Sequence, residues 1–273
     1  MKIDQKTLKI RILGCGDSAG VPRIGGDWGD CNPANPKNRR TRPSILVQSE
    51  TTSLVIDTGP DFGLQLTREN LKTIDAVLYT HDHNDHIAGI DDLRIIRGRI
   101  GRNIPIYSDK RTYESLKARF AYMFIEQSPF YPTVINPYIW NQNDFGKKQR
   151  FGDIEFIPFE QDHGEGNISL GFRFGDFGYS TDMRHLDGRA LSILKGIKTW
   201  VADCADYAHG HGTLHANLPI VQKLNAEIGA EIVYLTHLKM FYDYDKMCLD
   251  LPEGYTPAYD GLLLEAHQFN YEN

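Results

Sequence analysis

Short apolar runs bounded by glycine, proline and polar residues recur along the chain and predict strands. In the first half they cover residues 9–13, 44–48, 54–57 and 76–79. In the second half they lie near residues 154–157, 169–174, 177–180, 200–202 and 232–235. Apolar residues at helical spacing over 189–195 and 214–228 predict helices between these later strands. Helices and strands mixed in this order indicate a layered α/β architecture.

Residues 99–150 differ in composition from the rest of the chain. They carry nine Lys/Arg against four Asp/Glu, a net charge of +5, and ten of the 30 aromatic residues. Three prolines between residues 127 and 144 predict irregular structure there. We interpret 99–150 as a basic, aromatic insertion in a single domain of residues 1–273, which forms either a lid or the interface of a homodimer.

The overall composition is typical of a globular protein of 273 residues, with 41% apolar residues, 24% charged residues and a net charge of −6. The four cysteines, Cys15, Cys31, Cys204 and Cys248, form no C-x-x-C pair, which favours a reducing, cytoplasmic compartment over a disulfide framework. No apolar leader or membrane-spanning run is present, so we expect no membrane association. The negative charge argues mildly against nucleic-acid binding.

A cluster of imidazoles and carboxylates follows the predicted strand at 76–79. His81, His83, Asp85 and His86 lie within six residues, in the pattern H-x-H-x-D-H. Imidazole and carboxylate ligands suit Zn²⁺, Mn²⁺ and Fe²⁺, and a site with open positions can activate water. The alternative is a polar turn in which Asp85 caps the next helix and the histidines face solvent. Four candidate ligands at this spacing favour the metal site.

This pattern resembles the signature of the metallo-β-lactamase superfamily, and the resemblance continues from Gly14 to Glu265. It implies a four-layer αβ/βα sandwich and further ligands at strand ends. The residues that match these positions are His163, Asp182 and His237. The resemblance thus implies two divalent metal ions, one bound by His81, His83 and His163, the other by Asp85, His86 and His237, with Asp182 between them. His185, His209, His211 and His267 match no ligand position.

Asp57 follows the strand at 54–57 and matches the early D-x-G element of the superfamily. A carboxylate there can accept a hydrogen bond from a ligating imidazole and fix its tautomer. The alternative is a turn or N-cap role before a helix that starts near Asp61, and the two roles are compatible. Asp203 has the same ambiguity with less support.

The opening glycine-rich turn at 13–23 and the basic run at 37–42 resemble the branch that contains tRNase Z and the phosphodiesterase of the carbon-phosphorus lyase pathway. Ser18, Arg39 and Arg42 are therefore candidate substrate contacts, because backbone N–H groups and guanidinium groups bind phosphate. The glycines also fit a tight turn without a ligand. His215 matches the position of a non-ligand histidine that protonates the leaving oxygen; a helix-terminus role is the alternative.

These features predict a metal-dependent phosphodiesterase that acts on a small cyclic or nucleotide-like substrate, with water activated as hydroxide by two metals. Asp85 and Asp182 are secondary candidates to assist the attacking water. The alternatives are a tRNA 3′-processing endonuclease, with RNA as its substrate, and a thioester or lactam hydrolase. Zn²⁺ and Mn²⁺ are the favoured ions and Fe²⁺ is compatible with the ligands. The cysteine-rich zinc site of the carbon-phosphorus lyase relative is reduced here to Cys31, with Met240 in place of its histidine, so we expect no structural zinc.

Overall fold

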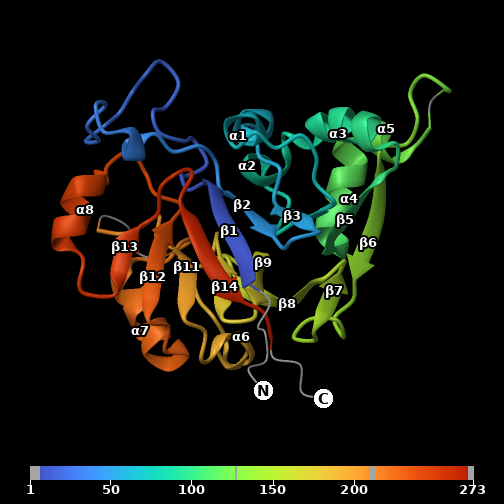
Figure 1. Ribbon diagram of the computed structural model, residues 1–273. Helices are drawn as coiled ribbons and strands as arrows, with labels where there is room; N and C mark the ends of the chain where they lie inside the picture. The colour runs from blue at the N-terminus through green and yellow to red at the C-terminus, as the bar shows by residue number, and fades with distance from the viewer. Residues whose placement is uncertain (1–6, 127, 209–212, 270–273) are drawn as a thin grey trace.

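The computed structural model describes residues 7–126, 128–208 and 213–269 and contains two seven-stranded sheets (Figure 1). The first sheet has the order β14 (Leu263–His267), β1 (Thr7–Gly14), β2 (Ser44–Gln48), β3 (Ser53–Ile56), β4 (Ala76–Leu78), β5 (Ile104–Asp109) and β6 (Ile135–Trp140). The second has the order β13 (Tyr255–Pro257), β12 (Ile232–Thr236), β11 (Thr199–Asp203), β10 (Phe177–Ser180), β9 (Ile168–Phe174), β8 (Ile154–Asp162) and β7 (Gln149–Phe151).

Helices cover the outer face of each sheet. The first sheet carries α1 (Phe62–Arg68), α2 (Asn84–Ile87), α3 (Leu93–Ile100), α4 (Lys110–Arg119) and α5 (Ala121–Phe124), and the second carries α6 (Gly188–Leu194), α7 (Leu218–Ile228) and α8 (Tyr244–Asp250). Two short 3-10 helices, η1 (Pro36–Asn38) and η2 (Ile90–Asp92), complete the elements. This four-layer αβ/βα arrangement confirms the predicted fold class.

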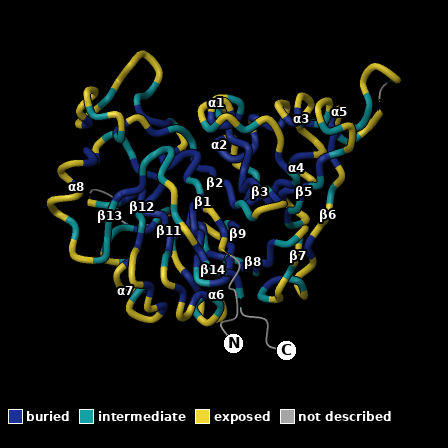
Figure 2. The backbone as a smooth tube through the Cα atoms, viewed as in Figure 1, coloured by how far each residue is buried: buried dark blue, intermediate teal, exposed yellow. Residues whose placement is uncertain are grey.

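The central core lies between the two sheets, where the buried tube segments of Figure 2 meet. Ile10 and Val47 of the first sheet face Phe172 and Tyr179 of the second, and all four are fully buried. Each such side chain stabilises the fold by roughly 1.5–3 kcal/mol relative to its exposed state. Separate apolar clusters attach the helices to the outer face of each sheet. No helix in the described ranges is long and apolar enough to span a membrane.

Most predicted elements match those observed. The strands at 44–48 and 177–180 have the predicted bounds, and β8 extends the prediction at 154–157 to Asp162. The helix predicted from 214 begins later, at Leu218. Its start is displaced because the Asn217 side chain accepts a hydrogen bond from Ile220 N and Pro219 occupies the first turn, where a missing N–H costs nothing.

Residues 99–150 supply β5, β6 and the first two residues of β7, and β6 and β7 are each an edge strand of their sheet. The prediction that 127–144 is irregular was wrong, because β6 lies within it and pairs in parallel with β5. Pro137 is tolerated since β6 is the edge strand of its sheet, where one N–H side needs no partner. Residues 128–134, which precede β6, form a loop that projects from the body beyond α5 (Figure 1).

Candidate metal centre

The cluster H-x-H-x-D-H lies where β4 leaves the first sheet and α2 begins. His81 and His83 are in the extended segment before α2, and His83 occupies the N-cap position with ψ 152°. Asp85 and His86 are in the first turn of α2 and are buried. The short helix thus reverses the chain and turns its carboxylate and its imidazole back toward the two preceding histidines. The four side chains come from one tight turn, as the spacing predicts.

The three remaining candidates follow strands of the second sheet, each within two residues of the strand's end. His163 follows β8, Asp182 follows β10 by two residues, and His237 follows β12. Asp182 and His237 have left-handed backbones, with φ of 48° and 61°. Such conformations are uncommon for non-glycine residues and are concentrated at functional sites. Asp182 and His237 both belong to the cluster of donor atoms described below.

Asp182 lies between two groups of imidazoles. Its Oδ1 is 4.0 Å from His81 Nε2 and 3.5 Å from His163 Nε2. Its Oδ2 is 2.9 Å from His86 Nε2 and 3.2 Å from His237 Nε2. One carboxylate oxygen therefore faces each group. This arrangement suits a carboxylate that bridges two ions.

The donor atoms form two sets of candidate ligands, in each of which all atoms lie within 4.8 Å of one another, and a third, overlapping set adds Asp203 and His215 to Asp182 and His237. The first set is His81, His83, His163 and Asp182, and the second is Asp85, His86, Asp182 and His237. The Nε2 atoms of His81, His86 and His237 are buried and make no hydrogen bond of good geometry, although two of them lie within 3.2 Å of a carboxylate oxygen. Buried donors and acceptors seldom stay unpaired in folded proteins. The residues therefore fit divalent cations bound by imidazole and carboxylate.

The buried carboxylates of the site favour the binding of cations. Burial alone raises the pKa of Asp182, but His237, His86 and His81 outweigh burial and hold that pKa well below its usual range. Burial lowers the pKa of His81, which keeps that imidazole neutral and able to ligate. For His237, burial is outweighed by Asp182 and Asp85, which raise its pKa to about 9. The two carboxylates thus favour positive charge at the second set, where a bound cation would replace protons.

Asp57 contacts His86 at Nδ1, the ring nitrogen that faces away from the candidate metal centre. Its Oδ2 lies 2.7 Å from His86 Nδ1 and accepts a hydrogen bond from Thr80 Oγ1 at 2.7 Å, while its Oδ1 accepts one from Thr80 N at 2.8 Å. Accepting from Nδ1–H leaves the Nε2 of His86 free to face Asp85 and Asp182. Asp57 caps no helix, because α1 begins at Phe62 after Asp61.

Asp203 contacts the Nδ1 of His215, as Asp57 contacts the Nδ1 of His86. Asp203 is fully buried at the end of β11, and its Oδ2 lies 2.7 Å from His215 Nδ1. Its oxygens also accept hydrogen bonds from Met183 N and Ala205 N, so Asp203 is fixed in place. Burial opposes protonation of His215, but Asp203 outweighs burial and raises the pKa of His215. The sequence indicated Asp203 as a candidate because, like Asp57, it lies at the end of a predicted strand.

The His215 ring stacks on His237, with centroids 4.7 Å apart, and one of its ring nitrogens lies within 4.8 Å of donor atoms of Asp182 and His237. His215 belongs to neither of the two sets of candidate ligands. His185 is exposed, and His267 Nδ1 is 3.1 Å from Asp176 Oδ2. His209 and His211 lie outside the described residues.

A pocket of about 200 Å³ opens onto the donor groups. Its wall is formed by candidate ligands and His215 together with Ser18, Glu165, Asn167 and Leu214. Ser18 reaches the pocket because the glycine-rich turn is hydrogen-bonded to the residue after His237, through Asp17 N to Leu238 O and Leu238 N to Cys15 O. Sequence reasoning missed Glu165 and Asn167, which follow His163 in a glycine-rich turn.

The two candidate arginines do not line this pocket. Arg39 is exposed, with its guanidinium 5.0 Å from the centre of the Trp28 ring. Arg42 pairs with Asp61, Nη1 to Oδ2 at 3.1 Å. Contact of either arginine with substrate remains a prediction.

Comparison with known proteins gives related chains of several kinds. A model of the β-lactamase superfamily domain matches residues 52–238. The octanoyltransferase of Porphyromonas gingivalis is 28% identical over 257 residues, 93% of this chain and 51% of that protein. Ribonuclease Z of Methanopyrus kandleri is 28% identical over 134 residues, 48% of this chain and 43% of that protein. The chain thus corresponds to about half the length of these curated relatives.

Among solved structures, a diphosphatase from the PhnP family is 32% identical, with a TM-score of 0.86. The similarity covers 97% of this chain and 99% of that chain.

Proposed function

The chain belongs to the β-lactamase superfamily, and we propose that it is a metal-dependent hydrolase that cleaves a small phosphodiester, cyclic or nucleotide-like, at a centre of two divalent ions. The observation that carries the proposal is the position of Asp182, with one carboxylate oxygen toward each group of histidines. His215 lies next to these residues, and its Nδ1 is hydrogen-bonded to Asp203.

Two divalent ions, when bound, polarise a phosphoryl oxygen and make water a stronger nucleophile at neutral pH. His81, His83 and His163 would hold one ion, Asp85, His86 and His237 the other, and Asp182 both. Zn²⁺ and Mn²⁺ suit these ligands, and Fe²⁺ is compatible with them. Asp57 contributes by keeping the His86 proton on Nδ1.

His215 is the proton donor in this proposal. Asp203 accepts the Nδ1–H of His215, so the proton that can be delivered to the substrate is the one on Nε2. The raised pKa of His215 favours the protonated ring near neutral pH. His215 lines the pocket, where its Nε2–H can protonate the oxygen that leaves the phosphorus atom.

The size of the pocket supports a small substrate. About 200 Å³ is below the 300–1,000 Å³ that is usual for sites that enclose a whole drug-sized ligand. A phosphodiester group fits such a space, with its remaining atoms outside. Ser18 and Asn167 offer a hydroxyl and an amide to the phosphoryl oxygens, and Glu165 places a carboxylate at the rim. The similarity to a PhnP-family diphosphatase also supports phosphorus chemistry.

A substrate panel tests the proposal. The metal-loaded chain is assayed against bis(p-nitrophenyl) phosphate, a 2′,3′-cyclic nucleotide, a precursor tRNA, a thioester and a chromogenic β-lactam. We expect turnover of the first two, and loss of this turnover in His215→Ala at unchanged metal content. Specific cleavage of precursor tRNA alone would favour the RNA-processing alternative that the ribonuclease Z relatives suggest. Turnover of only the thioester or the lactam would overturn the phosphodiesterase assignment.

A further inference from the structure

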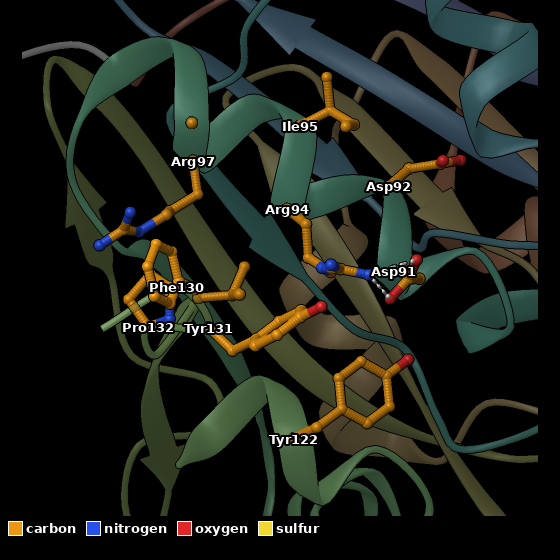
Figure 3. A pocket seen from close by; sticks show the side chains of 11 residues that line it. Asp91, Asp92, Arg94, Ile95, Arg97, Tyr122, Phe130, Tyr131 and Pro132 are labelled. Atoms are coloured by element: carbon orange, nitrogen blue, oxygen red, sulfur yellow. Dashed lines mark hydrogen bonds and ion pairs between the residues drawn. The ribbon is translucent and has the colours of Figure 1, made fainter. Parts of the chain in front are cut away.

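A second and larger cavity lies away from the metal centre. It has a volume of about 590 Å³ and is formed by η2, α3, Tyr122 of α5 and the loop before β6 (Figure 3). Its volume falls within the usual range for sites that enclose a small ligand. None of its lining residues lines the pocket at the metal centre. The cavity is therefore a separate site.

Arg97 gives the cavity an unpaired positive charge. Within the described ranges its side chain has no ion pair or hydrogen bond, and its Nε is buried without a partner. Arg94, one turn earlier on α3, is instead paired with Asp91, Nη1 to Oδ1 at 3.4 Å (Figure 3). Asp91 is thus neutralised by Arg94, and Asp92, whose carboxylate also lines the cavity, lies at the side opposite Arg97 in Figure 3. The Arg97 end of the cavity has no carboxylate bound to it. A buried guanidinium N–H without an acceptor favours an anionic ligand.

Aromatic side chains line the same cavity as the two arginines. Phe130 is 89% exposed and Tyr131 is 59% exposed, although both line the cavity. In Figure 3 the Tyr131 ring lies between Arg94 and Tyr122, while Phe130 lies near Arg97. Exposed rings of this kind are costly on a free surface and are typical of surfaces that stack on planar ligands. One end of the cavity therefore suits an anion and its middle suits a flat ring.

We propose that this cavity binds a nucleotide, with the phosphate on Arg97 and the base against Tyr131. A nucleotide joins the two required chemistries, a planar ring and an anion, in one small ligand. An apolar peptide would cover the rings but would supply no anion for the Arg97 Nε–H, and a second copy of the chain is the outcome that the last control below detects. The proposal is independent of the reaction at the metal centre, because the two sites share no lining residue.

Photolabelling of the metal-loaded full chain with 8-azido-AMP tests the proposal and separates the two sites by peptide mapping. We expect label in the peptide that contains Tyr122 and Tyr131. Arg97→Met should raise the AMP concentration that protects this peptide by roughly tenfold to a hundredfold, the usual effect of losing a charge-assisted hydrogen bond. Protection by adenosine should not change in this variant, because adenosine carries no phosphate.

Two further variants provide the controls. Arg99 lies on the same helix, but its guanidinium donates to Lys72 O and does not line the cavity. Labelling of Arg99→Met should therefore equal that of the wild type. Tyr131→Ala should weaken protection by AMP and by adenosine alike. Label confined to the peptides of the metal centre, or unchanged protection in Arg97→Met, would overturn the proposal. It would also be overturned if Tyr131→Ala converted a dimer to a monomer in sedimentation velocity while no label reached the cavity.

Discussion

Replacing Asp57 with asparagine should weaken one metal site without disturbing the backbone. Asp57 has φ of 66°, and asparagine tolerates this left-handed conformation better than most residues. The amide oxygen can still accept from Thr80 N, as Oδ1 does at 2.8 Å. The amide N–H₂ group then replaces Oδ2 and faces His86 Nδ1, now 2.7 Å from a carboxylate oxygen. Two donors would meet at this distance.

The conflict is relieved if the His86 proton moves from Nδ1 to Nε2. That nitrogen faces Asp182 Oδ2 at 2.9 Å and can no longer ligate when protonated. Loss of such an outer hydrogen bond usually reduces metal affinity about 10- to 100-fold, or about 1.4–2.7 kcal/mol. We expect this loss for the ion held by Asp85, His86 and His237, and little change for the ion held by His81, His83 and His163.

Competition with a chromophoric zinc chelator measures both affinities in one titration. Asp187→Asn is the matched control, because Asp187 caps α6 through a hydrogen bond from Ala190 N and asparagine caps equally well. The reasoning would be refuted if Asp57→Asn bound both ions as tightly as the wild type. It would also be refuted if the variant lost both sites equally while it remained folded.

Other substitutions test separate parts of the account. His215→Ala should keep the metal and reduce kcat by roughly 10²–10⁴-fold, which metal analysis and steady-state rates check together. Asp203→Asn should lower kcat by roughly tenfold or more, since the His215 ring loses its partner at Nδ1. Added imidazole should restore part of the rate of His215→Ala but should not restore that of Asp203→Asn. Arg40→Met should lower the free energy of unfolding by about 1–3 kcal/mol in urea denaturation, because the buried guanidinium donates to Tyr242 O at 2.7 Å and the thioether cannot make this hydrogen bond. Arg39→Met, a neighbouring exposed arginine, should cost less than about 1 kcal/mol in the same assay.

The metal-centre candidates could be identified from sequence because the chemistry is local. His81, His83, Asp85 and His86 fall in one turn, and their spacing carries the information. The distant His163, Asp182 and His237 came from the family resemblance, and the structure brings all seven side chains into two sets. Their role as ligands stays a prediction.

What the sequence left open depends on contacts between distant segments. Asp203 and His215 are 12 residues apart, and only the fold shows that they meet. Arg42 stays a candidate phosphate contact, and only the fold shows that it pairs with Asp61. The strand β6 was missed because its proline and irregular pattern oppose strand formation, which pairing with β5 overrides. The cavity at Arg97 joins α3 to a loop more than 30 residues later, so no local pattern predicts it.

We expect two ions bound around Asp182 to support phosphodiester hydrolysis. The most direct test is to add Mn²⁺ or Zn²⁺ stepwise to the metal-stripped chain while following the hydrolysis of bis(p-nitrophenyl) phosphate. We predict that the rate rises with added metal and reaches its plateau at about two equivalents per chain, as expected for a two-metal site. A chain that binds two equivalents and shows no hydrolysis, or that hydrolyses equally well without metal, would contradict the account.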